Sequence, residues 1–294
     1  MLNPDHLAAL AAIHRRGSFD LAAAALHVTP SAVSQRLKAL EEEIGTLLIR
    51  RGQPCRATET GLRLIRHFDA VSLMEKALTA DLPGLPDGPV PLRIAVNADS
   101  LATWVIPALA KVPGFLFDIV IDDQDVSQDW LRRGEVVAAV TSHPGPLQGC
   151  ETVRLGRLRY LATASPAYMD RWFPDGVSAE ALAHAPALTF SDKDRLQEIW
   201  VARVTEGKVA RAGFPSHHLA SSQGFVDACV HGLGWALNPD SLVRDQMADG
   251  RLVELVPGEY LDVALHWQFA RLTGPAIQPL TDALRAAARA ALHP

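Results

Sequence analysis

The sequence predicts a protein of two parts, a helical head and a larger α/β body. Its 294 residues correspond to about two domains at roughly 150 residues each. Residues 80–92 hold four prolines and two glycines, which mark a boundary between the parts. Helical periodicity dominates before this boundary, and short apolar runs alternate with helical stretches after it.

The stretch from Ser18 to Ile44 has the pattern of two helices that meet at a tight corner. A short alanine-rich helix from Phe19 to Leu26 is followed by a turn at residues 27–28. Thr29 can cap the second helix with its hydroxyl, and Pro30 suits the first helical position. One apolar stripe of this second helix is formed by Val33, Leu37, Leu40 and Ile44. Two ordinary packed helices would share this pattern.

The opposite face of the second helix carries hydrogen-bonding and basic side chains, and three arginines follow it within residues 47–58. A helix-turn-helix needs such a face because its side chains must reach base edges in the major groove. An arginine-bearing turn beside it suits a wing on the phosphate backbone. Double-stranded DNA is therefore a predicted partner. The candidate DNA-binding residues are Ser31, Ser34, Gln35, Arg36, Lys38, Arg50, Arg51, Arg56 and Thr58.

The distribution of charge supports this division. The net charge of −5 argues by itself against nucleic acid. Residues 1–66, however, carry a net charge of +3 and the remainder −8. A basic head on an acidic body is typical of a DNA-binding domain joined to a domain with another task. The acidic body favours a cationic ligand, although solubility alone explains such a charge equally well.

Several classes of protein are disfavoured. The three cysteines have no metal-ligand spacing and suit a reducing cytosol, so we expect a cytoplasmic protein without a metal or other cofactor. We expect no signal peptide, because the N-terminus lacks a basic region followed by a long apolar run, and no apolar run approaches the ~18 residues of a membrane span. GxSxG, HExxH and Walker A motifs are absent, which argues against an enzyme. The missing signal also argues against an exported solute-binding protein.

Two further helices complete the predicted head. Residues 5–16 have helical spacing and end at Gly17. Thr58 can cap a long helix over residues 59–79. The apolar residues Leu64, Phe68, Val71 and Leu78 lie close to one line along it. An exposed seam of this kind packs either on a second copy of the helix, which gives a dimer, or on its own domain.

The body alternates predicted strands and helices, which implies mostly parallel sheets with right-handed crossovers. The strands are expected at residues 92–96, 117–122, 136–141, 186–190, 234–239 and 263–269. The helices are expected at residues 100–109, 127–133, 224–232 and 280–292.

The segment SFDLAAAALHVTPSAVSQRLKALEEEIGTLLIRR, followed by ATETG, resembles the winged helix-turn-helix of the LysR-type transcriptional regulators. RIAVNADSLATWVIPAL and LRRGEVVAAV narrow the resemblance to the lysine/arginine-responsive subgroup, the ArgP/LysG/IciA-like regulators of basic amino-acid export. RWFPDGV and SSQGFVDACVHGLGWALNP extend it over nearly the whole chain.

This resemblance implies a domain plan. Residues 1–58 would form an all-α winged helix-turn-helix domain, and residues 59–90 a linker and dimerisation helix. Residues 91–294 would form an α/β effector domain of two Rossmann-like subdomains, as in periplasmic binding proteins. Subdomain I would comprise about 91–162 and 268–294, and subdomain II about 163–267. The two crossing strands are expected near 161–164 and 265–269.

The resemblance also implies partners. The regulator would act as a homodimer or homotetramer on a near-palindromic promoter, with RNA polymerase as a further partner. Its effector would be lysine or arginine, and its target an amino-acid exporter gene. Two alternatives share the same head: a nucleoid or replication-origin DNA-binding protein, and a LysR-type regulator with a different small-molecule effector.

Ligands of open α/β sheets bind beyond the carboxyl ends of strands, against helix N-termini. Hydroxyls and free N–H groups there suit the α-carboxylate of an amino acid, while its cationic groups need carboxylates. Asp99 is the first candidate for the carboxylate that binds a cationic group, followed by Asp122 and Asp123. Asp192 is a weaker candidate. Trp104 is a candidate to cover the ligand's stem or guanidinium. The candidate effector-binding residues are Asn97, Asp99, Ser100, Thr103, Trp104, Asp122, Asp123, Thr141, Ser142, Ser221 and Ser222. Helix capping for Asp99 and core packing for Trp104 are the simpler roles.

Overall fold

The structure is a computed structural model that describes residues 2–81, 88–121, 127–208 and 213–294. The chain divides into two compact units. The first contains the residues up to Leu92 with the segments Gly114–Leu116 and Leu272–Ala276. The second contains Arg93–Pro113, Phe117–Arg271 and Ile277–Pro294. The head and the long helix belong to the first unit, and nearly all of the body belongs to the second.

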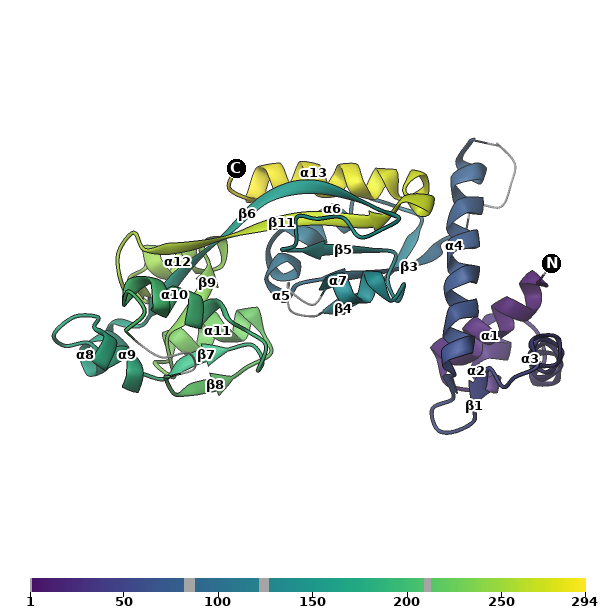
Figure 1. Ribbon diagram of the computed structural model, residues 1–294, viewed down its shortest axis with the longest axis horizontal. Coiled ribbons are helices and arrows are strands. Elements are labelled where there is room, and N and C mark those ends of the chain that lie inside the picture. The colour runs from purple at the N-terminus through teal and green to yellow at the C-terminus, as the bar shows by residue number, and fades with distance from the viewer. Residues whose placement is uncertain (1, 82–87, 122–126, 209–212) are drawn as a thin grey trace. The chain divides into compact units, whose positions relative to one another are not determined.

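Three helices form the head: α1 (Pro4–Arg16), α2 (Phe19–Ala25) and α3 (Pro30–Ile44) (Figure 1). The predicted cap of α3 is confirmed, since Thr29 Oγ1 accepts a hydrogen bond of 3.2 Å from the backbone N–H of Ala32. His27 makes the corner with a φ of +55°, in the left-handed region. The predicted stripe of α3 is buried at Val33, Leu37 and Leu40, with Ile44 partly buried against the same core.

A short wing follows α3. Its strands β1 (Ile49–Arg50) and β2 (Arg56–Ala57) pair antiparallel. Glu41 of α3 binds the start of the wing, because its Oε1 accepts from the backbone N–H groups of Leu48 at 2.8 Å and Ile49 at 3.3 Å. Helix α3 and the wing are therefore fastened to each other by one carboxylate.

The long helix α4 (Glu59–Asp81) begins directly after the wing. Thr58 Oγ1 accepts from the N–H of Gly61 at 3.1 Å, which confirms the predicted cap. Gly61 lies so close to the wing that a Cβ atom on it would be 2.3 Å from the carbonyl oxygen of Leu48. Farther along the helix Met74 and Leu78 are 36% and 56% exposed. The helix thus leaves part of its apolar seam uncovered in the single chain.

The first lobe of the body is built on strands β3 (Val90–Val96), β4 (Phe115–Ile121) and β5 (Ala138–Thr141), in the order β5-β3-β4. The C-terminal helix α13 (Gln278–Ala291) contacts helix α6 (Ile106–Leu109) and strand β6 (Cys150–Ala164). Helix α7 (Ser127–Arg132) lies next to β5. Buried apolar side chains such as Ala95 and Ala139 form the core of this lobe.

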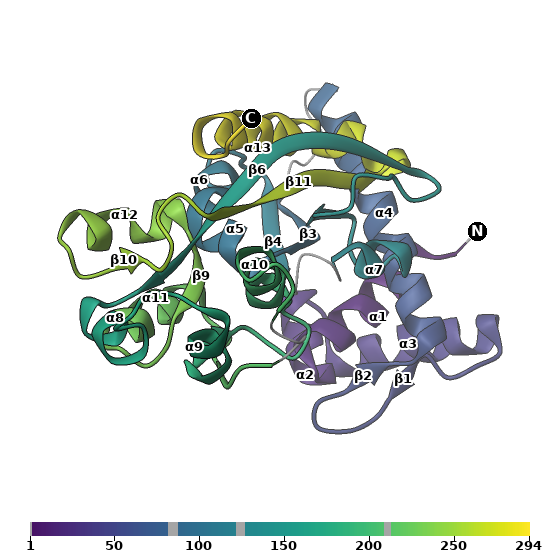
Figure 2. The same cartoon turned by 60° about the vertical axis from the view of Figure 1, so that its left-hand side comes forward.

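Two long strands join the lobes. Strand β11 (Tyr260–Ala270) pairs antiparallel with residues 150–161 of strand β6, with a register shift between Leu265 and His266, and the two strands run side by side between the lobes in both views (Figures 1 and 2). At one end β11 pairs with β5, and at the other end β6 pairs with β9 (Ala236–Pro239) and β10 (Val253–Glu254). The sheet is therefore mixed. The expectation of mostly parallel strands is wrong for these pairs because the connecting strands return in opposite directions.

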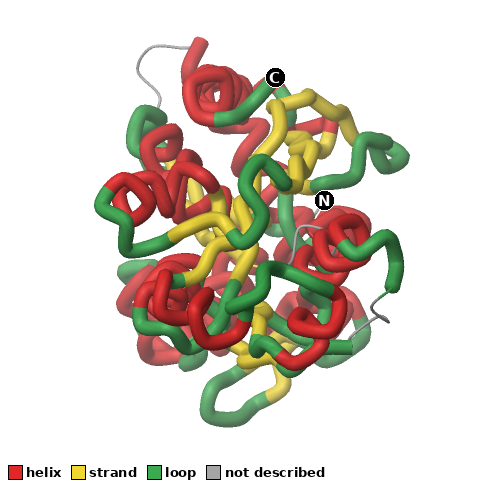
Figure 3. The backbone as a smooth tube through the Cα atoms, turned by 90° about the vertical axis from the view of Figure 1, so that its left-hand side faces the viewer, coloured by secondary structure: helices red, strands yellow, loops and turns green. Residues whose placement is uncertain are grey.

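The second lobe surrounds its strands with short helices (Figure 3). Strands β7 (Ala187–Thr189) and β8 (Ser216–His218) pair in parallel. Leu188, Phe225, Val226 and Cys229 belong to its core. The helices are α8 (Pro166–Trp172), α9 (Ala179–His184), α10 (Leu196–Val204), α11 (Ser222–Val230) and α12 (Asp240–Ala248).

The helix expected at residues 100–109 is divided into three pieces. A π-helical turn, Leu101–Val105, separates α5 (Ala98–Ser100) from α6. Turns of this kind inside helices are frequent at functional sites. Over the described ranges, no helix has both the length and the apolar character required to cross a bilayer.

Candidate functional site

The recognition helix α3 presents the polar face that the sequence predicted. Ser31, Gln35 and Lys38 are exposed, and Ser34 is half-buried. The Ser31 hydroxyl lies 3.0 Å from that of Thr29, and Lys38 forms an ion pair of 3.6 Å with Glu42. Gln35 and Lys38 thus remain on the surface as groups that can reach a DNA groove or a phosphate.

Two predicted DNA-binding residues have structural partners inside the head. Arg36 is half-buried and donates to Asp5 of α1 at 3.3 Å. The hydroxyl of Thr58 donates to the carbonyl of Leu47 at 3.0 Å while it caps α4. Both residues therefore help to hold the head together. Glu41, which fastens the wing, was missed by sequence reasoning because its partners are backbone groups.

The wing carries the three predicted arginines. Arg50, Arg51 and Arg56 are all exposed, and the Arg51 guanidinium lies over the Phe19 ring at 5.5 Å from its centroid. The stems of these side chains start from a strand pair that Glu41 ties to α3. The three positive charges consequently lie on the same rigid head as the recognition helix.

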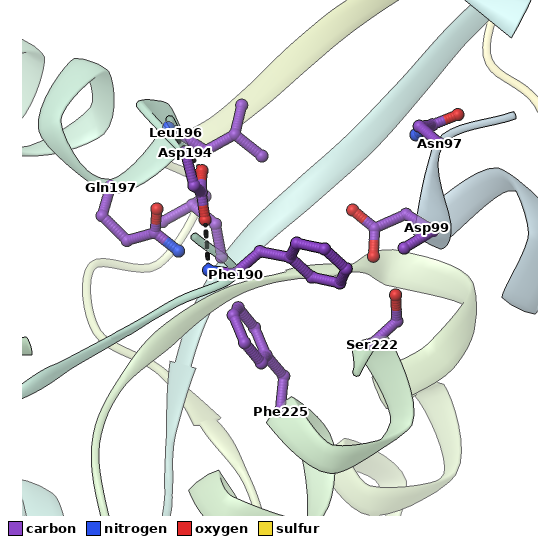
Figure 4. Close-up of a pocket in the computed structure, with 10 residues that line it drawn as sticks. Asn97, Asp99, Phe190, Asp194, Leu196, Gln197, Ser222 and Phe225 are labelled. Atoms are coloured by element: carbon purple, nitrogen blue, oxygen red, sulfur yellow. Dashed lines mark hydrogen bonds between the residues drawn. The ribbon is translucent and has the colours of Figure 1, made fainter. Parts of the chain in front are cut away.

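A pocket in the body brings together residues of both lobes (Figure 4). The first lobe contributes the residues just beyond β3, where α5 begins, as the strand-end rule predicts. The second lobe contributes the loop after β7, the start of α10 and the start of α11. The lining residues are Asn97, Ala98, Asp99, Phe190, Asp194, Leu196, Gln197, Ser222, Phe225 and Leu237.

Asp99 is the central carboxylate of the first lobe. Its Oδ2 accepts a hydrogen bond of 2.8 Å from the hydroxyl of Tyr160, and the side chain points toward Ser222 (Figure 4). Burial raises the pKa of Asp99, while the nearby hydroxyls of Ser222 and Tyr160 act in the opposite direction and the Asp194 carboxylate adds to the rise. A charged Asp99 is therefore held at a cost that a bound cation would offset.

Asp194 supplies a second carboxylate from the other lobe. Its Oδ2 accepts from the N–H of Phe190 at 2.9 Å, and its Oδ1 from the N–H of Leu196 at 3.0 Å. Burial raises its pKa as well, against these hydrogen bonds. Figure 4 shows the two aspartates on opposite sides of the pocket, with the Phe190 ring between them and the Phe225 ring nearby.

The polar lining is rich in acceptors. Asn97 Oδ1 and Gln197 Oε1 are buried, with no hydrogen-bond partner among the described residues. The Gln197 amide nitrogen is already used, since it donates to the carbonyl of Leu188 at 2.7 Å. None of the lining residues is basic. Unsatisfied buried acceptors beside two carboxylates suit a ligand that brings positive charge and several N–H donors.

The structure brings some of the predicted effector residues into this pocket and not others. Asn97, Asp99 and Ser222 line it. Asp122 and Asp123 lie outside the described residues. The remaining predicted residues are not part of the lining: Ser100, Thr103, Trp104, Thr141, Ser142 and Ser221.

Local contacts or burial explain why three of these residues do not line the pocket. The Thr103 hydroxyl donates to the carbonyl of Asp99 at 2.6 Å, inside its own helical segment. Trp104 is 2% exposed and belongs to the core. Ser221 caps α11 through an acceptor contact of 3.0 Å with the N–H of Gly224. Asp192, the weaker choice, is exposed and pairs with His218 at 3.3 Å instead of turning into the pocket.

Comparison with known proteins agrees with this architecture. Residues 4–62 match the bacterial regulatory helix-turn-helix protein family of the lysR type, and residues 90–291 match the LysR substrate binding domain. The LysG regulator of Mycobacterium tuberculosis is 42% identical over 288 residues, which cover 98% of this chain and 94% of that protein. The ArgP regulator of Pseudomonas aeruginosa is 42% identical over 287 residues, covering 96% of this chain and 94% of the relative.

Solved structures are similar over the full length. ArgP from Mycobacterium tuberculosis superimposes with a TM-score of 0.80 at 40% identity, covering 100% of this chain and 99% of the other. LysG from Corynebacterium glutamicum with bound effector arginine has a TM-score of 0.67 at 37% identity, with 99% and 100% covered. The predicted fold class and the predicted resemblance are confirmed, and the relatives are regulators rather than enzymes. The chain belongs to the LysR family of DNA-binding transcriptional regulators.

Proposed function

We propose that this regulator senses a basic amino acid, lysine or arginine, and controls transcription of a gene for its export. The observation that carries the proposal is the pair of carboxylates, Asp99 and Asp194, on opposite sides of a pocket without basic lining residues. Lysine and arginine carry two cationic groups separated by an aliphatic stem. A neutral or acidic amino acid would leave at least one of the two carboxylates without a cationic partner.

The rest of the pocket suits the same ligand. Its stem can pack against the Phe190 and Phe225 rings, and its N–H groups can reach the buried acceptors of Asn97 and Gln197. The α-carboxylate suits the start of α11, where a helix N-terminus favours negative charge. The arginine-bound relative from Corynebacterium glutamicum, at 37% identity, supports this assignment.

The domain roles follow from the same proposal. Residues 1–58 bind DNA, residues 59–90 form the linker and dimerisation helix, and residues 91–294 bind the effector. Met74 and Leu78 on α4 are exposed apolar groups that a second α4 can cover, which supports a homodimer or a homotetramer.

A ligand that bridges two lobes favours the closed form only through its differential affinity for that form. Closure then changes how the paired heads meet a near-palindromic promoter and RNA polymerase.

A thermal-shift screen of the full chain against the twenty amino acids tests the effector. A ligand at ~100 times its Kd adds about 2.7 kcal/mol to the stability of the domain it binds, which gives a shift of several degrees. We expect shifts with lysine and arginine and none with citrulline or norleucine, which keep the stems without the side-chain charge. Equal shifts with the neutral analogues would contradict the role of the two carboxylates.

Substitutions in the head separate base contacts from phosphate contacts. Gln35→Ala is expected to weaken binding to the cognate site by about 1–3 kcal/mol and to relax its sequence preference. Arg50→Ala, Arg51→Ala or Arg56→Ala should weaken binding to all DNA sequences alike and reduce the steepness with which affinity falls as salt rises. Fluorescence anisotropy with cognate and scrambled duplexes at several salt concentrations measures both effects. The same loss of preference in both groups of variants would contradict this division.

The exporter gene and promoter-specific action need their own test. Mapping of bound DNA in cells is expected to find a near-palindromic site upstream of a transport gene whose transcript responds to lysine or arginine. Competition with unrelated DNA should show specific binding tighter by ~10³ or more. Binding spread over A/T-rich DNA without such a ratio would instead favour a nucleoid or replication-origin protein.

A further inference from the structure

Three structural elements meet at the carboxylate of Asp99. Asp99 itself belongs to α5 of the first lobe, and Ser222 approaches it from α11 of the second lobe. The third contact is the hydroxyl of Tyr160, at 2.8 Å from Asp99 Oδ2. Tyr160 belongs to neither lobe's ligand loops, because it lies on the connecting strand β6.

The backbone of Tyr160 is fixed within this connection. It pairs with Leu261 of the second connecting strand β11 and with Pro239 of β9. The side chain is fully buried, at 0% exposure. Its hydroxyl therefore reaches the pocket from a rigid support, and any bend of the connecting strands displaces the donor relative to Asp99.

We propose that Tyr160 is a positioning residue of the effector site, which holds the Asp99 carboxylate from the connecting strand so that the carboxylate meets a cationic group of the ligand. This inference rests on the proposed recognition of a basic amino acid by Asp99. It adds a residue outside the pocket lining and links ligand charge to the strands that join the lobes.

The hydroxyl affects both the direction and the charge of Asp99. A phenol that donates to a carboxylate oxygen favours the ionised form, and burial opposes it, so loss of the donor raises the pKa of Asp99 further. The groups that face Asp99 are Tyr160 on β6, Ser222 on α11 and the second carboxylate, Asp194. Because the Tyr160 hydroxyl donates to Asp99, its removal should change how arginine affinity depends on pH through the protonation of Asp99.

The test is the binding of arginine to the full chain by titration calorimetry between pH 5 and pH 9. Wild-type affinity is expected to fall at low pH as the carboxylates take up protons. Tyr160→Phe should move the midpoint of this fall upward by about one pH unit. At pH values below the wild-type midpoint the variant should bind about tenfold more weakly, and the gap should narrow at high pH.

Tyr168→Phe is the matched control. Tyr168 is also a buried tyrosine, at 2% exposure, and its hydroxyl donates to the carbonyl of Pro186 at 2.6 Å rather than to a carboxylate. Removal of this hydroxyl should reduce stability without moving the midpoint of arginine binding. Asp99→Asn should remove the part of the fall in arginine affinity at low pH whose midpoint Tyr160→Phe moves.

The outcomes separate this inference from the proposed function. If wild-type protein binds arginine and Tyr160→Phe has the same midpoint, the positioning role is wrong while the proposed function stands. An equal displacement in Tyr168→Phe would show a general effect of a lost buried hydroxyl and would also overturn the inference. If wild-type protein binds neither arginine nor lysine, both the inference and the proposed effector fall.

Discussion

Gly61→Ala is expected to lower the free energy of unfolding of the head by about 3 kcal/mol. The new Cβ would lie 2.3 Å from the carbonyl oxygen of Leu48 and 3.2 Å from the Cβ of Ala57. The Leu48 carbonyl cannot move away freely, because it accepts from the N–H of Thr58 at 2.9 Å. Relief of the clash must therefore separate the wing from the start of α4. Urea unfolding of the full chain, with DNA affinity measured in parallel, checks the expectation.

Gly52→Ala is the control for this prediction. Gly52 lies in the same wing, but a Cβ on it would meet only the carbonyl oxygen of Pro54 at 3.5 Å, an ordinary contact. Its change in stability should stay within about 0.5 kcal/mol. If the two variants unfold at the same urea concentration, the close approach of α4 to the wing does not constrain the head.

Asp99→Asn is expected to weaken arginine binding by about 30-fold to 1,000-fold, because a buried cation then loses its charged partner. The ligand-free protein should be as stable as the wild type or more stable at neutral pH, since the variant no longer buries a charge. Calorimetric titration measures the first effect and thermal unfolding the second. If the variant is stable but no longer binds arginine, the charge of Asp99 serves ligand binding rather than the stability of the fold.

The pH dependence of stability follows from the same carboxylate. The pKa of Asp99 is raised in the folded protein, so the folded state holds this proton more tightly than the unfolded chain does. Its contribution to stability is therefore fully present below the unfolded pKa and is lost as the pH rises through the folded pKa. Asp99→Asn should remove that loss in the ligand-free protein. An unchanged pH profile in the variant would contradict the raised pKa.

The elements of the head were predictable because their signals are local. Thr29 and Thr58 bond to N–H groups three residues ahead, and Pro30 fits the first turn of α3. Such caps depend on a few neighbouring residues and can be recognised in sequence. The first half of the pocket was predictable for a similar reason, because Asp99 lies three residues after the end of strand β3.

The second half of the pocket depends on the tertiary fold. Asp192 and Asp194 are two residues apart, and only the contacts of Asp194 with the N–H groups of Phe190 and Leu196 show which of them turns inward. An acidic residue just before the helix that contains Gln197 is a sequence signal that could have identified it. Tyr160 gave no signal of this kind, since 61 positions separate it from Asp99 along the chain.

The connecting strands also determine the order in which the chain can fold as it is synthesised. The head draws its core from residues near the N-terminus, from Leu7 to Ile65. Strand β6, in contrast, pairs Cys150 with Ala270 of β11, so the sheet of the first lobe stays incomplete until the chain has nearly ended. Domains fold as units during synthesis, and distant pairings form late. A nascent chain therefore has all residues of its head core long before the last strand of its body has been made, so the two parts can fold at different times.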